Sequence, residues 1–298
     1  MVKQVTIIGA GAIGKAIGKT LSENQETKIH FWDVVKNKVR NQRPLADIVP
    51  TADFLFLCLP SFATPAAIKN IKPFLKKETI VISVSKGIDK KSKKFISQIL
   101  KESLPASQNF ALLYGPMLAS ELMRNQGGAA VAATTKKSAF EKIKKIFSHS
   151  GLLVSYSSDV VGVGALGVLK NVYAISLGIA DGLGWQNNRK GFLTAKILEE
   201  IFRLLPLLGG RAQTTLTPAG VGDLIATGFC PTSHNQQLGR QLALRLAGSK
   251  ESEGYYSLPP LAQKLDKRIK NFPLLSTIYQ VVIKNQDAKI AFSRLIKN

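Results

Sequence analysis

The chain has 298 residues, 45% of them hydrophobic, and a mean hydropathy of +0.07, which suits about two domains with sizeable cores. Lysine and arginine number 41 against 19 acidic residues, and the net charge of +22 favours phosphorylated ligands, nucleic acid or an anionic membrane surface as partners. Two widely separated cysteines, Cys58 and Cys230, and a start without the regions of a signal peptide argue against a disulfide-rich secreted protein and for a cytoplasmic one.

The first half of the chain alternates between strands and helices. Strands are expected over 4–8, 28–32, 54–59, 79–84, 110–114, 129–134 and 152–156. A helix is expected over 14–24, and the lysine-rich segment 136–147 is expected to be an amphipathic helix with Phe140, Ile143 and Phe147 on one face. Strands that alternate with helices predict an α/β fold with a mostly parallel, doubly wound sheet.

After Ser158 the strand pattern stops. Helices are expected over 160–183, 190–208, 235–247, 257–270 and 273–284. This change from an alternating to an all-helical pattern predicts two domains, 1–158 and 159–298.

The first of these helices carries only one charged side chain between Val160 and Ala180, namely Lys170. Its length would suffice for a membrane span. However, four glycines weaken an isolated helix there, and a central lysine costs roughly 2.5–3.5 kcal/mol on insertion scales. We therefore expect a helix buried inside a globular domain, in which a lysine must be paired or used.

A glycine turn follows the first strand. Gly9, Gly11 and Gly14 form the pattern G-x-G-x-x-G, which opens a helix. Such glycines permit a tight turn and close approach of the backbone to a pyrophosphate, and the helix N-terminus favours its negative charge. The turn therefore predicts a dinucleotide site, with an ordinary strand-to-helix turn as the alternative.

Asp33 ends the second strand, where a carboxylate accepts hydrogen bonds from ribose hydroxyls and repels a 2′-phosphate. This favours NAD over NADP. Lys36, Lys38 and Arg40 follow closely and would suit NADP, so the cofactor stays a choice between the two. The alternative for Asp33 is an ordinary turn residue.

Three further stretches carry polar side chains at the ends of predicted elements. Lys86 follows a strand, at the sheet edge that faces ligands in open α/β sheets, or is simply an exposed loop residue. Asp223 and Thr227 are spaced to share one helix face, although Asp223 would also suit a helix N-cap. The third stretch, "SHN" (233–235), has phosphate-binding groups, and Ser233 would equally serve as a helix cap.

Several motifs occur in order along nearly the whole chain. They are GAGAIG (9–14), LPS (59–61), SKGID (85–89), YGPMLASE (114–121), LKNVYAISLGIADGLGWQNN (169–188), AGVGDLIAT (219–227), SHN (233–235) and SEGYYS (252–257). This order resembles the NAD(P)-dependent glycerol-3-phosphate dehydrogenase family. The resemblance implies an N-terminal Rossmann-type domain and a C-terminal all-helical substrate domain like that of 6-phosphogluconate dehydrogenase, with the site in the cleft between them.

The resemblance also implies an activity and roles for individual residues. The activity is reduction of dihydroxyacetone phosphate to sn-glycerol 3-phosphate with NAD(P)H and no metal, which feeds glycerophospholipid synthesis; the family commonly forms homodimers. Catalytic roles fall on Lys170, Asn171 and Asp223. Substrate-binding roles fall on Lys86, Gly115, Thr227, Ser233, His234 and Asn235. Cofactor-binding roles fall on Gly9, Gly11, Ala12, Ile13, Gly14, Asp33, Pro60, Ser61, Lys86, Ala119 and Glu253.

The residue types fit this chemistry on their own terms. Hydride transfer to a ketone carbon leaves negative charge on its oxygen, which a positioned ammonium stabilises and protonates. Lys170 is the candidate, Asp223 would hold it, and Asn171 would orient the lysine or a substrate hydroxyl. The alternative is a lysine that extends from a helix end to solvent.

The chain departs from the family pattern at several positions. His234 stands where the family usually has a phosphate-binding arginine, Met117 replaces a serine, and Ile13 replaces a tryptophan or similar bulky residue in the glycine turn. The segment 33–53 is shorter, and Val34 replaces an arginine that meets a 2′-phosphate in many bacterial members, which again favours NAD.

Two alternative functions follow. The departures at His234 and Met117 leave open a related dehydrogenase of another small hydroxy acid or a phosphate-free polyol. The charge of +22 leaves open a basic dinucleotide-binding protein whose partner is nucleic acid or another protein. Lys170 and Asp223 together argue against a pure binding protein.

Overall fold

The structure, a computed structural model, describes residues 2–248 and 251–297. It separates into two compact units. One comprises the described residues up to Lys86 together with Ile96–Gly164, and the other comprises Gly87–Phe95 and the described residues from Ala165 onward. Each unit has its own hydrophobic core.

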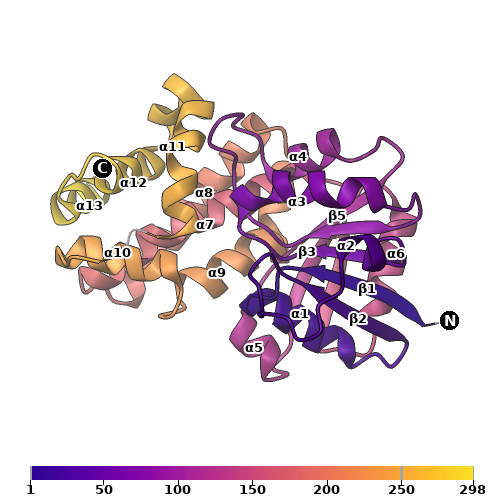
Figure 1. Cartoon of the computed structure of the whole chain (residues 1–298). Helices are drawn as coiled ribbons and strands as arrows, with labels where there is room; N and C mark the ends of the chain where they lie inside the picture. The colour runs from indigo at the N-terminus through magenta and orange to yellow at the C-terminus, as the bar shows by residue number, and fades with distance from the viewer. Residues whose placement is uncertain (1, 249–250, 298) are drawn as a thin grey trace. The chain divides into compact units, whose positions relative to one another are not determined.

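The first unit is built on a seven-stranded sheet with the order β2-β1-β3-β4-β5-β6-β7 (Figure 1). The strands are β1 (Lys3–Ile8), β2 (Thr27–Trp32), β3 (Phe54–Leu57), β4 (Ile80–Ser83), β5 (Asn109–Tyr114), β6 (Gly128–Ala133) and β7 (Leu152–Ser157). All neighbouring strands are parallel except β5 and β6, which are antiparallel. The predicted mostly parallel sheet is therefore confirmed.

Helices cover both faces of this sheet, as the doubly wound pattern requires (Figure 1). The helices α1 (Ala12–Ser22) and α6 (Lys137–Ile146) pack on one face, and α3 (Thr64–Ile71) and α4 (Ile96–Ser103) lie on the other. Two short helices, α2 (Leu45–Ile48) and α5 (Ala119–Met123), complete the unit. The predicted apolar face of α6 is buried, with Phe140, Ile143 and Phe147 in the core.

The second unit is helical, as predicted. Its helices are α7 (Val160–Gly182, from Ala165 onward in this unit), α8 (Asn187–Leu207), α9 (Asp223–Gly228), α10 (His234–Leu244), α11 (Glu253–Leu265), α12 (Pro273–Val282) and α13 (Ala288–Lys297). Helical turns η3 (Ala212–Leu216), η4 (Pro218–Gly222) and η5 (Asp266–Asn271) connect them.

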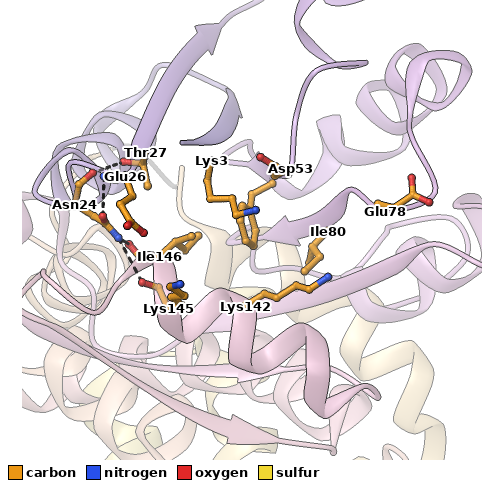
Figure 2. Close-up of a pocket in the computed structure, with 11 residues that line it drawn as sticks. Lys3, Asn24, Glu26, Thr27, Asp53, Glu78, Ile80, Lys142, Lys145 and Ile146 are labelled. Atoms are coloured by element: carbon orange, nitrogen blue, oxygen red, sulfur yellow. Dashed lines mark hydrogen bonds between the residues drawn. The ribbon is translucent and has the colours of Figure 1, made fainter. Parts of the chain in front are cut away.

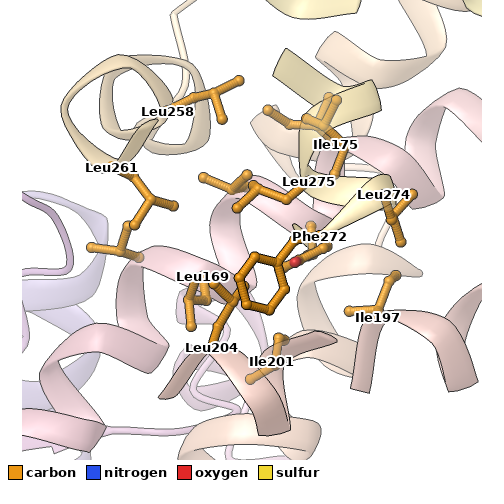
Figure 3. Packing of buried hydrophobic residues seen from close by; sticks show 14 of the residues in the cluster. Leu169, Ile175, Ile197, Ile201, Leu204, Leu258, Leu261, Phe272, Leu274 and Leu275 are labelled. Atoms are coloured by element: carbon orange, nitrogen blue, oxygen red, sulfur yellow. The ribbon is translucent and has the colours of Figure 1, made fainter. Parts of the chain in front are cut away.

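Helix α7 forms the centre of this unit. Among the described residues it is the one helix with the length and composition of a membrane span, yet 94% of its most apolar 18-residue window is buried inside the protein. Figure 3 shows Leu169 and Ile175 of α7 packed among leucine and isoleucine side chains of α8 and α11. Burial of each such side chain stabilises the fold by about 1.5–3 kcal/mol. The expectation of a buried core helix is confirmed.

The structure differs from the predicted elements in the last third of the chain. Helix α11 begins at Glu253 because the Ser252 hydroxyl caps it by accepting from Tyr255 N, and Pro259 and Pro260 lie inside it. The predicted helix over 257–270 is therefore α11 followed by η5. Helix α13 was not predicted, although Ala288, Ala291 and Phe292 have the spacing of a buried helix face.

The predicted domain boundary after residue 158 stays a prediction. In the structure, the two compact units meet inside α7, between Gly164 and Ala165. Cys58 and Cys230 are both free cysteines, and the expectation of reduced thiols stays a prediction. Burial raises the pKa of Cys58 to about 12.

Candidate active site

A buried lysine in the middle of α7 forms a network with two side chains of α9. Lys170 is 7% exposed, and its Nζ donates to Thr227 Oγ1 at 2.8 Å and lies 3.3 Å from Asp223 Oδ1. Thr227 donates in turn to the same carboxylate oxygen at 3.3 Å. Burial of an ammonium is costly without such a partner, so this lysine is held by the pair and does not extend to solvent.

The helical turns η3 and η4, which precede α9, position these two side chains. Gly220 in η4 lies so close to the Thr215 carbonyl that a Cβ there would overlap it. Helix α9 then starts with Asp223, and Thr227 follows one turn later on the same face. The N-cap of α9 is Gly222, so Asp223 is not the cap that the sequence left open as an alternative.

A second network of amides adjoins Lys170 along α7. Asn171 donates to the Gly167 carbonyl at 3.1 Å and accepts from Asn235 Nδ2 at 2.9 Å. Asn235 accepts in turn from the backbone N–H of Gly254 at 2.9 Å. All three residues are buried, so the orientation of the Asn171 amide is fixed. A Cβ on Gly254 would collide with Asn171 and Asn235, and the sequence pattern does not indicate this residue, although it indicates the neighbouring Glu253.

The two residues before Asn235 lie at the start of α10. His234 is the first residue of the helix and is exposed, and Ser233 occupies the N-cap position without a side-chain capping bond. Within 2–248 and 251–297, no hydrogen bond joins either side chain to the Lys170 network. The helix start leaves backbone N–H groups that favour an anion.

In the first unit the glycine turn has the geometry that a dinucleotide phosphate requires. Gly9 has a φ of +103°, and a Cβ on Gly14 would overlap the Gly9 carbonyl oxygen. By contrast, a Cβ on Gly11 would meet nothing within 4 Å, so the backbone there is open to a ligand. Ala12 and Ile13 follow in the first turn of α1. The turn therefore fits the phosphates of a dinucleotide.

Asp33 lies directly after β2 and faces this turn. Its carboxylate accepts from Ala10 N at 2.8 Å and Val35 N at 3.0 Å, and the Lys38 ammonium lies 3.0 Å away. Burial on its own raises the pKa of Asp33, but these hydrogen bonds and Lys38 outweigh it, so the pKa is lowered and the group is ionised. The Gln42 amide, which no sequence motif indicates, accepts from the Asp33 backbone N–H and donates to the Asp33 carbonyl, and so folds the shortened segment back.

Lys86 lies beyond the end of β4 and is half-buried. Its ammonium lies 3.4 Å from the Gly115 carbonyl oxygen and 5.5 Å from the centre of the Tyr114 ring. The Tyr114 hydroxyl donates to the Ser85 carbonyl and so supports the Lys86 loop. The structure therefore brings two predicted residues, Lys86 and Gly115, together, and adds Tyr114 to them.

The remaining predicted residues of the first unit lie just after β3 or at the start of α5. Pro60 is exposed and Ser61 is half-buried after β3, and Ala119 begins α5. Met117 is 8% exposed and packs in the apolar core, so the methionine at this departure from the family pattern serves packing. Among the residues that the structure describes, no cluster of three or more histidine, cysteine or acidic side chains suits a metal ion.

Together the two units carry the parts of a nicotinamide-dependent oxidoreductase: a Rossmann-type sheet with a glycine turn after its first strand, and a buried lysine held by a carboxylate. Residues 33–140 match the family described as NAD-dependent glycerol-3-phosphate dehydrogenase N-terminus, and residues 159–293 match the C-terminus of the same description. The chain belongs to the NAD-dependent glycerol-3-phosphate dehydrogenase family.

Relatives match over nearly the full length. The chain is 27% identical to glycerol-3-phosphate dehydrogenase (NAD(P)+) of Clostridium tetani, over 99% of this chain and 92% of the relative. It is 29% identical to the protein of the same name from Clostridium acetobutylicum, over 96% and 94%. The crystal structure of a glycerol-3-phosphate dehydrogenase from Coxiella burnetii has the same fold, with a TM-score of 0.88 and 24% identity over 100% of this chain and 99% of that one.

Proposed function

We propose that this chain reduces dihydroxyacetone phosphate to sn-glycerol 3-phosphate, reversibly, with a nicotinamide dinucleotide as the hydride donor. The observation that carries the proposal is the buried Lys170 with its partners Asp223 and Thr227. Family membership and the names of the full-length relatives support the same activity. We place the enzyme in the cytoplasm, as a homodimer that supplies glycerophospholipid synthesis.

The cofactor supplies hydride to the ketone carbon when bound. Residues Gly9–Gly14 would hold its phosphates, and Asp33 would accept from the ribose hydroxyls. Lys38 already neutralises part of the Asp33 charge, which weakens its repulsion of a 2′-phosphate. Val34, which carries no charge, favours NAD, and we propose NAD as the preferred cofactor. Pro60, Ser61, Ala119 and Glu253 stay predictions.

Lys170 performs the proton transfer in this proposal. As negative charge develops on the carbonyl oxygen, the ammonium stabilises it and donates a proton to that oxygen. In the reverse direction the neutral amine accepts the hydroxyl proton. Asp223 and Thr227 hold Nζ in place, and the bond that Asn171 donates to the Gly167 carbonyl and the one it accepts from Asn235 fix Asn171 for contact with the substrate.

The substrate phosphate is held at the start of α10 in this proposal. Ser233 and His234 occupy the N-cap and first helical positions, where backbone N–H groups and the helix dipole favour a dianion. Lys86 and Gly115 stay predicted substrate contacts.

Substitution of Lys170 tests the proposed activity. Lys170→Met keeps most of the length of the side chain and removes its charge, so kcat for dihydroxyacetone phosphate should fall by about 10²-fold or more, because the oxyanion loses its stabilising donor. Binding of NADH, measured by fluorescence, should change less than about twofold. Lys190→Met is the matched control, because Lys190 also pairs with an aspartate of this unit, Asp181. Equal turnover of the Lys170 variant and wild type would remove the proposed role.

The exposed His234 favours a second candidate, a dehydrogenase of another small hydroxy acid or a phosphate-free polyol. A histidine offers one donor where an arginine offers a bidentate pair. Initial rates with dihydroxyacetone and its phosphate, each with NADH and NADPH, separate the two candidates. Equal kcat/KM with and without the phosphate would support the second one.

A further inference from the structure

A cavity of about 380 Å³ lies in the first unit at the end of the sheet where strands β1 to β4 begin, opposite the end that carries the glycine turn. Lys3, Thr27, Phe54 and Ile80 line it, and each is the first residue of its strand, from β1 to β4 respectively. The glycine turn follows the last residue of β1. The cavity is therefore separate from the predicted dinucleotide site.

Three ammonium groups surround this cavity. Figure 2 shows Lys3 directed toward the wall that α6 forms, from which Lys142 and Lys145 extend. Among the described residues none of these three lysines forms an ion pair. Like charges around one concave space repel one another, and an anion between them relieves the repulsion.

Three carboxylates also line the cavity, those of Glu26, Asp53 and Glu78. The carboxylates of Asp53 and Glu78 point away from α6, and Asp53 already accepts from Gln4 N at 2.8 Å (Figure 2). Asn24 donates to the carbonyls of Lys145 and Ile146, which fixes the end of α6 at the cavity wall. The floor is apolar, since Phe54, Ile80 and Ile146 line it.

We propose that this cavity binds a small organic anion, a phosphate or carboxylate on a short apolar body. Its volume lies within the range of about 300–1,000 Å³ that ligand pockets occupy. The ammonium groups of Lys3, Lys142 and Lys145 take the anionic group as point charges, and the apolar floor takes the body. An anion small enough to lie between the three ammonium groups avoids the carboxylates of Glu26, Asp53 and Glu78, whereas an extended polyanion would meet them, which argues against nucleic acid or a membrane surface. This site does not depend on the proposed activity.

Calorimetric titration with phenyl phosphate tests the proposal on the full-length protein. The triple variant Lys3→Gln, Lys142→Gln, Lys145→Gln removes the cavity cations, and the triple variant Lys101→Gln, Lys137→Gln, Lys144→Gln removes the same charge from exposed positions outside the cavity. Titrations with and without dihydroxyacetone phosphate separate binding in the cavity from binding at the proposed substrate site. Wild type and control should bind alike, whereas the cavity variant should bind about tenfold more weakly or not at all.

Two further comparisons complete the test. Phenol, which lacks the charge, should bind much more weakly than phenyl phosphate, and added salt should weaken binding of phenyl phosphate. Turnover of both triple variants should match wild type. The proposal is overturned if wild type does not bind phenyl phosphate, if both triple variants lose equal affinity, or if phenol binds as well as the phosphate.

Discussion

At the scale of single residues, His234 decides how the proposed phosphate is held. A guanidinium forms two parallel bonds to a phosphate, and an imidazole forms one. We therefore expect His234→Arg to lower KM for dihydroxyacetone phosphate about tenfold and His234→Ala to raise it by a similar factor, with little change in kcat. Initial rates at fixed NADH measure both values.

Two controls separate this effect from a general one. KM for dihydroxyacetone, which has no phosphate, should not respond to either substitution. His149→Arg introduces the same charge at an exposed position of the first unit and should leave KM unchanged. If KM for the phosphate is the same in all His234 variants, the start of α10 does not bind it.

At the scale of helices, a buried carboxylate joins three elements of the second unit. Glu200 of α8 is 6% exposed and accepts from the Tyr173 hydroxyl of α7 at 2.7 Å and from the backbone N–H groups of Leu274 and Leu275 at 2.7 and 3.0 Å. It thus satisfies two free N–H groups at the start of α12. Tyr173 lies three residues after Lys170, so the same carboxylate anchors the helix that carries the lysine.

This carboxylate predicts a pH dependence of stability. Burial raises the pKa of Glu200 above the ordinary value of 4.5 for a glutamate, although the bonds from Tyr173, Leu274 and Leu275 oppose the shift. The folded protein therefore binds this proton more readily than the unfolded chain, and the free energy of unfolding falls as the pH rises from 4.5 through the folded pKa. Glu200→Gln should cost about 1–3 kcal/mol, and its cost relative to wild type should be larger at pH 4.5 than at pH 7.5.

Urea unfolding at the two pH values measures this difference. Glu199→Gln is the matched control, because Glu199 is the neighbouring residue and pairs with Lys196 in solvent, where a surface pair contributes little. A cost of Glu200→Gln that is equal at both pH values would contradict the assigned shift.

At the scale of the whole molecule, the net charge of +22 should steer an anionic substrate to the protein. Because salt screens such a field, kcat/KM for dihydroxyacetone phosphate should fall as NaCl is raised from low to near-physiological ionic strength, while kcat changes little. Rates with uncharged dihydroxyacetone should stay constant and serve as the control. A salt-independent kcat/KM would show that the charge does not act on the substrate.

Much of the fold was predictable from local pattern. The seven strands have periodic apolar residues and turn signals, and each was predicted within about two residues of its observed ends. Helix α13 escaped prediction because its apolar spacing covers only a few residues, and α11 was placed too late because Pro259 and Pro260 suggest a helix start. Packing against the rest of the unit stabilises both helices.

The candidate site also has a part that the sequence predicted and a part that it did not. The sequence indicated Lys170, Asn171, Asp223 and Thr227 through one charge in an apolar helix, a helical i, i+4 spacing and the family resemblance. It did not indicate that Asn171 reaches Gly254 through Asn235, because that bond depends on how α7, α10 and α11 pack. Nor did it indicate that Lys38 pairs with Asp33, which depends on a loop conformation.

The sequence by itself determined the change from an alternating to an all-helical pattern, the glycine turn after the first strand and the family, because these rest on residue types at fixed local spacing. Only the tertiary structure decided which groups meet: Lys170 with Asp223 and Thr227, Glu200 with Tyr173 and α12, and three lysines around a cavity at the far edge of the sheet. The physical reason is that hydrogen bonds and ion pairs act over a few ångströms, and packing alone brings residues distant in the chain within that reach.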